Sequence, residues 1–486
     1  MVNYEIVGRQ RELARIAELK TASKPAFVAV YGRRRIGKTF LIRQGFKDLL
    51  ALELTGMKDG TLIEQLRNFT LALAKASHGK FPSEGHPKSW QAAFEQLIQW
   101  CETLPKNRKY VVFFDELPWL ASPRSRFLQG LDYFWNHWGS RQDNLILVVC
   151  GSAASWIIQK LLNNKGGLHN RITHRFRLLP FDLAETREFL ISRHVRLSDY
   201  QILELTMAMG GVPLYLEQAR PGESAAQIID RTCFARDGLL RDEFKQLYAA
   251  LFDTPERHLE IVKALASKSA GISRNDIASM TGQSPSGRLT AVIDELVESG
   301  FVQCTLPFGK STKDTLYRLA DEYSLFYLQW IERRRRDANS GWQSIRGSPK
   351  WRAWSGMAFE SVCMKHVGQI KHALGISGVS TNTSSWRFQP SIDSENEGAQ
   401  IDMLIDRADA CINLCEMKFS ETEFTIAKDY AKRLQARREI FRRVSKTKKS
   451  LFLTFVTTHG IKNNPYSLEV VDSSVTLDAL FKRESR

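Results

Sequence analysis

A glycine-rich segment near the amino end of the chain carries residues that could hold phosphate groups. Residues 27–39 read FVAVYGRRRIGKT, an apolar run followed by the spacing GxxxxGKT. Glycines at these positions let the backbone curl so that its N–H groups point at phosphate oxygens. Lys38 would then reach the β- and γ-phosphates of a nucleotide, and Thr39 would ligate Mg²⁺. The residues predicted to line this loop are Gly32, Arg33, Arg34, Arg35, Ile36, Gly37, Lys38, Thr39 and Phe40.

Two acidic residues at the end of a second apolar run fit the same chemistry. Residues 110–114 predict a buried strand, which Asp115 and Glu116 follow directly. Asp115 is the predicted acid on the metal side, and Glu116 would polarise the attacking water. A third apolar run, within residues 144–151, ends at Ser152, whose hydroxyl could sense the γ-phosphate. We expect ATP and Mg²⁺ as cofactors, against the alternative that a glycine-rich turn and polar strand ends occur here by chance.

A second group of chemically active residues lies far along the chain. Residues 399–420, AQIDMLIDRADACINLCEMKFS, predict two short strands with Asp402 on the first and Glu416 and Lys418 on the second. The period of two along a strand places Glu416 and Lys418 on one face, with Asp402 in reach across a hairpin. Glu360 lies on a predicted helix that precedes the hairpin. Acids and a lysine gathered in this way would bind Mg²⁺ and activate water for attack on a phosphodiester. The predicted metal ligands are Asp402, Glu416 and Glu360.

The elements that must position these residues follow from the periodicity of apolar side chains. The chain has 486 residues, 43% of them hydrophobic, which is too long for one core and indicates a multidomain protein. Alternating strands and helices over residues 1–180 predict a doubly wound parallel α/β domain. Residues 181–250 show helical periodicity and predict a helical lid. Residues 251–335 predict a winged helix, and residues 345–486 predict a further α/β domain.

The predicted winged helix has two possible roles. Its recognition helix would span residues 284–299, and Arg274 and Arg288 could contact phosphate. Acidic residues in the second half of that helix argue against deep insertion into a major groove. DNA binding and a role as spacer or protein contact therefore both stay open. The run Arg333 to Arg336 could clamp phosphates, or it could solvate a helix end.

Four motifs together resemble a known family. IVGRQREL (residues 6–13), GRRRIGKT, FFDEL and GGVPLYL (residues 210–216) are similar to the archaeal-type ATPases, a branch of the AAA+ and STAND-like P-loop ATPases. The resemblance covers the first half of the chain. It implies that the first motif lies near the adenine and that a Gly-Gly-x-Pro turn of the lid approaches the nucleotide. It also implies that an arginine before the last core strand contacts the γ-phosphate. The residues it adds to the site are Val7, Gly8, Arg9, Pro213 and Arg171, with Arg175, Arg177 and a merely solvated basic face as alternatives to Arg171.

The order of elements after residue 345 resembles the restriction-endonuclease-like, or PD-(D/E)xK, fold. A helix, a hairpin with D…ExK, a basic helix and a strand follow one another, and the same ATPase family often ends in such a domain. Gln400 stands where that family commonly has an acid. Two interpretations stay open: a nuclease centre, and a relic of the fold that is used for binding.

The net charge and the composition limit which classes of partner the chain can bind. A net charge of +16 favours a polyanion, and DNA is the expected partner because clustered lysine and arginine displace counterions from phosphates. We expect a cytoplasmic protein without a membrane span, since no apolar run is long enough and the start lacks a signal-peptide core. A protein partner or a homo-oligomer is also compatible. The leading hypothesis is an ATPase whose nucleotide state gates a DNA-acting, nuclease-like domain; the alternative is a nucleotide-dependent switch that cuts nothing.

Overall fold

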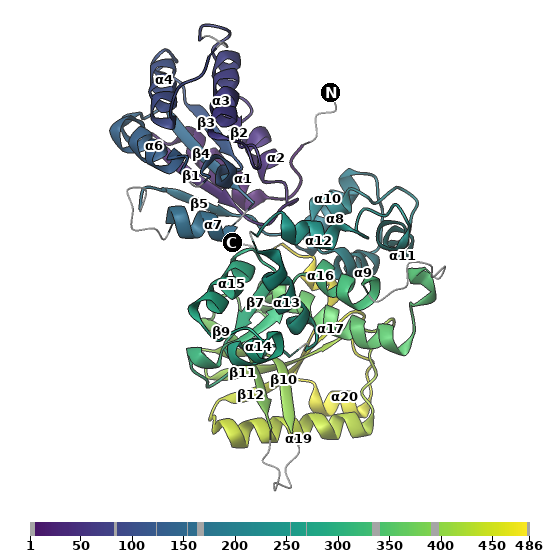
Figure 1. Cartoon of the computed structure of the whole chain (residues 1–486). Coiled ribbons are helices and arrows are strands. Elements are labelled where there is room, and N and C mark those ends of the chain that lie inside the picture. Colours follow the sequence, from purple (N-terminus) through teal and green to yellow (C-terminus); the bar gives the residue numbers. More distant parts are fainter. Residues whose placement is uncertain are drawn as a thin grey trace. The chain divides into compact units, whose positions relative to one another are not determined.

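The chain folds into two compact units, Met1–Leu179 and Pro180–Arg486 (Figure 1). The computed structural model describes residues 5–81, 85–122, 124–152, 154–162, 170–252, 254–268, 270–332, 341–389 and 398–483. Within these ranges, no helix combines the length and the apolar character needed to cross a bilayer. The predicted phosphate clamp at 333–336 lies outside the described residues.

A five-stranded parallel sheet forms the centre of the first unit, in the order β2–β3–β4–β1–β5. Its strands are β1 (Ala26–Tyr31), β2 (Leu50–Thr55), β3 (Tyr110–Asp115), β4 (Leu145–Gly151) and β5 (His174–Arg177). Strands β1, β3 and β4 are buried along their whole length, as expected for strands covered on both faces. Because all neighbours run parallel, the carboxyl ends of these three strands meet at one edge of the sheet.

Helices cover both faces of this sheet (Figure 1). They are α1 (Gln10–Thr21), α2 (Lys38–Gly45), α3 (Leu62–Ala76), α4 (Trp90–Glu102), α5 (Leu117–Leu120), α6 (Phe127–Tyr133) and α7 (Ala154–Ile157). One core joins α1 and α2 to Val28 and Val30 of β1, and the other joins α3, α4 and α6 to Phe27 and Ala29. Successive strand residues point to opposite faces, so one strand supplies both cores. The predicted parallel α/β fold is confirmed.

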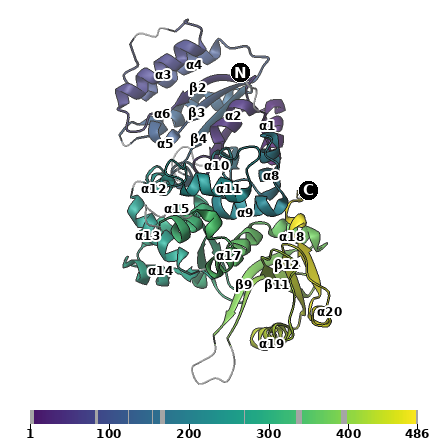
Figure 2. The ribbon, with the colours of Figure 1, turned by 90° about the vertical axis from the view of Figure 1, so that its right-hand side faces the viewer.

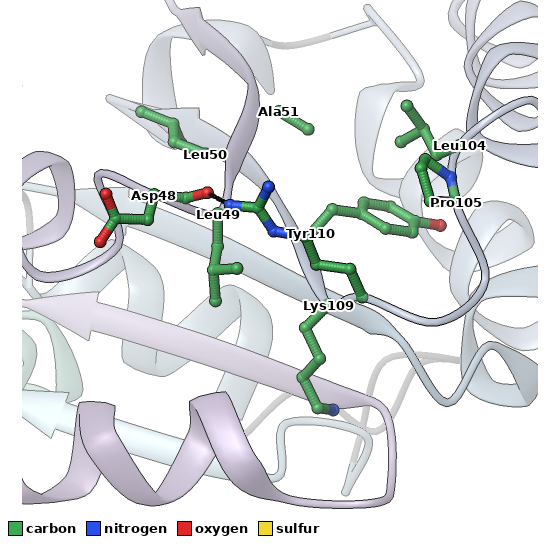
Figure 3. A pocket seen from close by; sticks show the side chains of 9 residues that line it. Asp48, Leu49, Leu50, Ala51, Leu104, Pro105, Lys109 and Tyr110 are labelled. Carbon is green, nitrogen blue, oxygen red and sulfur yellow. Dashed lines mark hydrogen bonds between the residues drawn. The ribbon is translucent and has the colours of Figure 1, made fainter.

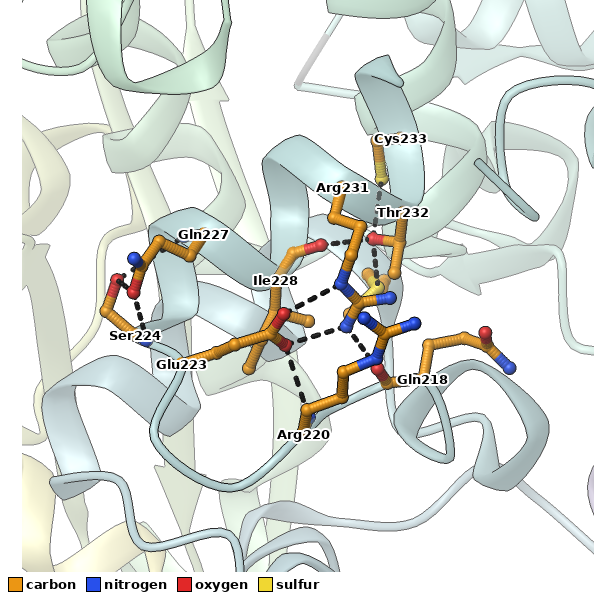
Figure 4. A network of polar contacts seen from close by, with 10 residues as sticks. Gln218, Arg220, Glu223, Ser224, Gln227, Ile228, Arg231, Thr232 and Cys233 are labelled. Atoms are coloured by element: carbon orange, nitrogen blue, oxygen red, sulfur yellow. Dashed lines mark hydrogen bonds and ion pairs between the residues drawn. The ribbon is translucent and has the colours of Figure 1, made fainter. Parts of the chain in front are cut away.

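Five helices open the second unit. They are α8 (Leu183–Ser192), α9 (Asp199–Met209), α10 (Pro213–Leu216), α11 (Ala225–Ile229) and α12 (Glu243–Ala249). Side-chain caps fix where three of them begin, because Asp182, Ser198 and Ser224 each accept an N–H from the first turn. A bidentate ion pair secures the turn before α11, where Arg231 donates from Nε and Nη2 to the two Glu223 oxygens, each at 2.7 Å (Figure 4). Short, capped helices thus account for the helical periodicity of this segment.

A small module of helices and strands follows. It consists of α13 (Pro255–Ala266), β6 (Ile272–Ser273), α14 (Arg274–Thr281), α15 (Gly287–Glu298), β7 (Val302–Thr305) and β8 (Leu316–Leu319), with the antiparallel order β6–β8–β7. The winged helix predicted for residues 251–335 includes a ribbon of two strands, and the structure adds the two-residue strand β6. Periodicity could not reveal β6, because two residues show no alternation and Ser273 is also the N-cap of α14.

A second five-stranded sheet lies near the carboxyl end, in the order β13–β12–β11–β10–β9. Its strands are β9 (Thr381–Phe388), β10 (Ala399–Arg407), β11 (Cys411–Lys418), β12 (Ser450–Thr457) and β13 (Ser473–Thr476). Strands β9, β10 and β11 pair antiparallel, whereas β11, β12 and β13 pair parallel. The hairpin predicted over residues 399–420 is β10–β11, with Met403 opposite Cys415.

Two helices cover the opposite faces of this sheet (Figure 2). The helices of this part are α16 (Glu322–Phe326), α17 (Pro349–Lys365), α18 (Val367–Ala373), α19 (Lys428–Ser445), α20 (Pro465–Val470) and α21 (Leu477–Leu480). The core on the α17 side contains Met403 and Cys415, and the core on the α19 side contains Ile412 and Leu414. Residues of both strands can therefore face either helix.

The packing of the Gly210–Gly211 turn against Phe181 can be tested directly, because Gly211 has no room for a side chain. A Cβ at this position would lie 1.9 Å from the Phe181 carbonyl oxygen, and the Phe181 N–H donates to the Gly211 carbonyl at 2.7 Å. We expect Gly211→Ala to lower the free energy of unfolding by about 1–3 kcal/mol in urea denaturation, since a backbone carbonyl cannot rotate away. Gly287→Ala is the control, because its Cβ would meet no atom within 4 Å. Equal stability of the two variants would contradict the packing.

Candidate functional site

The loop between β1 and α2 has the backbone shape that its sequence predicts. It connects Tyr31 to Lys38, and Gly32 in it adopts a φ of 147°. A Cβ on Gly32 would lie 2.3 Å from the Leu178 carbonyl oxygen, so no other residue fits without moving the backbone. Gly37 directly precedes α2. The helix therefore begins where the loop ends, which directs its first N–H groups toward an anion held by the loop.

Lys38 is buried and folds back over this loop. Its Nζ donates to the carbonyl oxygens of Gly32 at 3.0 Å and Arg33 at 2.8 Å. Burial lowers the pKa of Lys38, while Cys150 and Glu116 act in the opposite direction. Both acceptors are neutral carbonyls, so a phosphate oxygen is a stronger partner for the ammonium. Lys38 can therefore exchange these bonds for a triphosphate.

Thr39 and Asp115 lie far apart in the sequence but come together in the structure. The Thr39 hydroxyl donates to Asp115 Oδ2 at 2.8 Å, although 76 residues separate them. Burial raises the pKa of Asp115, and the bond from Thr39 opposes this effect. Mg²⁺ prefers oxygen ligands and takes one or two from the protein, with the rest from phosphates and water. The hydroxyl and carboxylate fit Mg²⁺ held jointly with a nucleotide.

Glu116 has a partner that sequence reasoning missed. The Ser152 hydroxyl donates to Glu116 Oε1 at 2.7 Å, and the Ser152 N–H donates to Oε2 at 3.2 Å. The two residues follow adjacent strands, β3 and β4, which end at the same edge of the sheet. Ser152 was predicted as a sensor of the γ-phosphate, and in the structure it orients the carboxylate that would polarise water. The parallel strand ends were the signal that could have revealed this pair.

The predicted adenine segment reaches the phosphate loop itself. Gly8 and Arg9 are buried and Val7 is partly buried, and Arg9 Nη2 donates to the Ile36 carbonyl at 3.1 Å. Arg9 thus braces the loop from the start of α1. The other predicted loop residues have different surroundings. Arg33 is buried and Phe40 is exposed, while Arg34 lies over the Trp119 ring and Arg35 has a backbone φ of 71°.

Arg171, which the family resemblance adds to the site, lies at the opposite edge of the sheet from the phosphate loop. Arg171 is exposed and precedes β5, which pairs in parallel with β1 so that His174 is opposite Val28 and Arg177 is opposite Tyr31. Arg171 therefore lies at the amino edge of the sheet, whereas the phosphate loop follows the carboxyl edge. The structure does not bring Arg171 to the phosphate loop of its own chain. Of the alternative arginines, Arg177 lies at the carboxyl edge of the sheet. Pro213 begins α10 in the second unit.

A hollow at the amino edge of the first sheet contains none of the predicted residues (Figure 3). It is lined by Asp48, Leu49, Leu50, Ala51, Leu104, Pro105, Arg108, Lys109 and Tyr110. These residues precede or begin β2 and β3. Because the strands are parallel, this hollow is separated from the phosphate loop by the length of the sheet.

The predicted acids and lysine of the second unit gather around the β10–β11 hairpin. Glu416 is buried and accepts from Tyr430 Oη at 2.9 Å and from Lys418 Nζ at 3.1 Å. Arg437 Nη1 also contacts Glu416 Oε1. Tyr430 and Arg437 both belong to α19 and were not predicted as site residues. Their spacing of seven, two turns of a helix, was the signal that could have placed them on one side.

Asp402 and Glu360 complete this cluster. A register shift in the pairing of β10 with β9 marks a bulge around Asp402, and bulges redirect side chains. Burial and the neighbouring Asp402 raise the pKa of Glu360 to about 7, while Arg318 opposes this shift. Gln400 donates from Nε2 to Asp402 Oδ1 at 2.8 Å.

The cluster does not fit a metal ion as it stands. Among the described residues, no three or more histidine, cysteine, aspartate or glutamate side chains are arranged to hold one. Glu416 already accepts from Lys418, Tyr430 and Arg437. The structure thus gathers Glu360, Asp402, Glu416 and Lys418, the residues that the sequence predicts, with cations rather than open ligand positions between them.

Comparison with known proteins identifies an ATPase domain in the first part of the chain. Residues 6–219 match a family model described as an ATPase domain predominantly from Archaea. An uncharacterised protein of Methanocaldococcus jannaschii is 24% identical over 332 residues, which cover 67% of this chain and 68% of that protein. A Walker-type ATPase of Pyrococcus abyssi superposes with a TM-score of 0.49 at 19% identity, over 67% of this chain and 96% of that one. The Aeropyrum pernix ORC2 protein, in ADPNP and ADP complexes, has a TM-score of 0.43 at 16% identity, over 68% and 95%. The family match supports ATP binding and ATPase activity in the first unit.

Proposed function

We propose that this chain binds and hydrolyses ATP at the β1–α2 loop, and that the bound nucleotide controls a DNA-acting, nuclease-like carboxyl-terminal domain. The observation that carries the ATPase part is the meeting of Lys38, Thr39 and Asp115 at one edge of a parallel sheet. Lys38 would stabilise charge on the β- and γ-phosphates, and Glu116, oriented by Ser152, would polarise the attacking water. Mg²⁺ held by Thr39 and Asp115 would neutralise phosphate charge.

The proposed gating is supported by the way α17 joins two parts of the second unit. At its carboxyl end, His366 Nε2 accepts the Leu183 N–H at 3.1 Å, and Lys365 Nζ contacts Glu322 Oε1 at 2.5 Å. Leu183 is the first residue of α8. Glu360 lies on the same helix, about 8 Å along its axis from Lys365 at 1.5 Å per residue. A displacement at the end of α17 would therefore move Glu360. This residue belongs to the carboxylate cluster, by which we mean Glu360, Asp402 and Glu416.

The Gly-Gly-x-Pro turn contacts the same joint. A Cβ on Gly210 would lie 3.2 Å from Glu322 Oε2, so this glycine packs directly against the acid that binds Lys365. Gly211 is held by the Phe181 N–H just before α8. The family resemblance implies that this turn approaches the nucleotide. We infer that ATP acts on the turn, the turn acts on α17 through Glu322, and α17 positions Glu360.

The order of α13, β6, α14, α15, β7 and β8 supports a winged helix, and its contacts favour a role within the chain. The Phe308 N–H, in the β7–β8 loop, donates to the Ser385 carbonyl of β9 at 2.9 Å, and the Phe308 ring packs against Phe441 of α19. Arg274, predicted to contact phosphate, donates to the carbonyls of Pro285 and Ser286 instead. The wing is thus engaged with the carboxyl-terminal sheet, which supports the spacer role over DNA reading by the wing.

The positive charge supports DNA as the partner of the carboxyl-terminal domain, and oligomerisation would give Arg171 a role. An exposed arginine at the amino edge of the sheet can reach a γ-phosphate only on another copy of the chain. The alternative function, a nucleotide-dependent switch that does not cut, is favoured by one observation: Glu416 is closed by three donors.

Nicking of supercoiled plasmid distinguishes these functions. We expect the wild-type chain to nick DNA in the presence of ATP with Mg²⁺ or Mn²⁺, and Asp402→Ala plus Lys418→Ala to abolish nicking while ATP turnover persists. The matched control is Asp429→Ala plus Lys432→Ala, a pair of exposed residues on α19. Nicking that survives the first pair of substitutions removes the nuclease assignment. DNA binding without nicking by the wild-type chain leaves the switch as the function.

A further inference from the structure

The carboxylate cluster carries its own cation at the position where a nuclease would need a metal. Arg437 reaches across from α19 and contacts Glu416 Oε1, while Tyr430 occupies Oε2 at 2.9 Å. Lys418 also lies 3.1 Å from Oε2. Glu416 is 3% exposed, so little of the carboxylate is accessible to water or to an ion. Any divalent cation that binds Glu416 must first displace one of these donors.

The charges of the cluster balance without a metal. Its acids are Glu360, Asp402 and Glu416, and its cations are Lys418, Arg437 and Arg318, a β8 residue that acts electrostatically on Glu360. Because the pKa of Glu360 is about 7, the acids carry between two and three negative charges at neutral pH against three cations, so no net negative charge attracts an added divalent ion. With one cation removed and Glu360 ionised, the site would be net negative, which is the arrangement that binds Mg²⁺ or Mn²⁺.

We propose that Arg437 stands in for a divalent cation on Glu416 and keeps the cluster closed, so that the cluster binds a divalent metal only after Arg437 withdraws. The inference rests on the proposed function of this domain and deepens it by naming the residue that regulates the site. Arg437 is the donor best placed to leave, because it reaches Glu416 from another element, α19, whereas Lys418 belongs to the same strand as Glu416; the two side chains are equally accessible, at 27% and 28% exposed.

The chemistry of a guanidinium indicates what would draw Arg437 away. Its planar fork binds phosphate oxygens bidentately, and a phosphodiester offers two such oxygens. A nucleic-acid backbone entering the site would thus remove the blocking cation and open Glu416 in one event.

Binding of Mn²⁺ to the full-length chain without nucleotide tests this proposal and requires no cleavage. Free Mn²⁺ is counted by electron paramagnetic resonance for wild type, Arg437→Met and Arg437→Met with Asp402→Asn. We expect the Arg437→Met chain to bind one more Mn²⁺ ion than the wild-type chain. The Kd of this ion should be at least about 10-fold lower than the Kd of any Mn²⁺ bound at the wild-type cluster. The added Asp402→Asn substitution should remove that ion. Arg437→Gln is the second variant, because it retains a donor toward Glu416 and perturbs folding less.

A matched control separates this effect from a general loss of positive charge. Arg442→Met removes an exposed arginine from the same helix, whose nearest acid is Glu439 at 4.0 Å, and should bind Mn²⁺ as wild type does. The proposal is overturned if the folded Arg437 variants gain no Mn²⁺, or if the wild-type cluster binds it equally tightly. A gain of Mn²⁺ in a chain that never nicks DNA would refute the nuclease function alone. Nicking by a wild-type chain whose Arg437 variants gain no ion would refute this inference alone.

Discussion

A chain carrying Lys38→Ala will bind ATP at least about 100-fold more weakly than wild type and will show no measurable ATP turnover. The side chain is buried against the β1–α2 loop, where it donates to two backbone carbonyls. Alanine leaves those carbonyls and removes the single ammonium that would meet the β- and γ-phosphates. A hydrogen bond to a charged group contributes about 1.5–3 kcal/mol each, and two of them correspond to a loss of this size. Equilibrium titration with a fluorescent ATP analogue and a phosphate-release assay measure the two quantities.

Lys109→Ala is the matched control for this substitution. Lys109 Nζ also donates to two backbone carbonyls, those of Lys24 at 2.9 Å and Asp143 at 2.8 Å, but it lies at the amino edge of the sheet. The control should bind ATP as wild type does, even if its stability falls. Unchanged nucleotide affinity in Lys38→Ala would refute the assignment of the phosphate loop.

Glu116→Gln will separate hydrolysis from binding. The amide keeps the size of the side chain, and it can accept the Ser152 N–H while its NH₂ group donates to the Ser152 hydroxyl, but it cannot accept a proton from the attacking water. Because general bases contribute about 10²- to 10⁴-fold to rates, we expect kcat to fall by at least about 100-fold while the Kd for ATP changes by less than about threefold. The variant should accumulate in the ATP-bound state.

The control for this experiment is Glu95→Gln, an exposed glutamate on α4. It should retain wild-type turnover. A Glu116→Gln chain that hydrolyses ATP at the wild-type rate would show that another group polarises the water. Loss of binding together with turnover would instead assign Glu116 a role in holding the nucleotide.

The sequence predicts the strand, the glycine-rich loop and the helix at residues 26–45 because the pattern that specifies them is local. Glycine spacing, the apolar run before it and the following Lys38 and Thr39 all fall within 13 residues, and a buried strand ending in Asp115 supplies the rest. Strand ends in a parallel sheet meet at one edge, which brings Asp115 to the side where Thr39 lies, and the strand order and the position of α2 then set their distance of 2.8 Å. The ExK pattern on β11 likewise follows from a strand period of two.

The contacts that sequence could not predict depend on register and on tertiary packing. The edge at which Arg171 lies follows from the pairing of β5 with β1, which no pattern in the residues before β5 reveals. From the sequence, Arg437 is only one of the basic residues of a predicted helix, because periodicity does not specify which flank of that helix meets the sheet. The bulge that redirects Asp402 is a property of the paired strands. Each of these features changes what a residue does, while the identity of the elements stays as predicted.

Hydrogen–deuterium exchange of the full-length chain, with and without a non-hydrolysable ATP analogue, tests the central claim most directly. The nucleotide should change exchange in peptides that cover the 32–37 loop, the Gly210–Gly211 turn, α17 and the β10–β11 hairpin. Lys38→Ala should abolish all of these changes, and Lys109→Ala should preserve them. A nucleotide effect confined to the loop, with α17 and the hairpin unaltered in the wild-type chain, would contradict control of the carboxylate cluster by ATP.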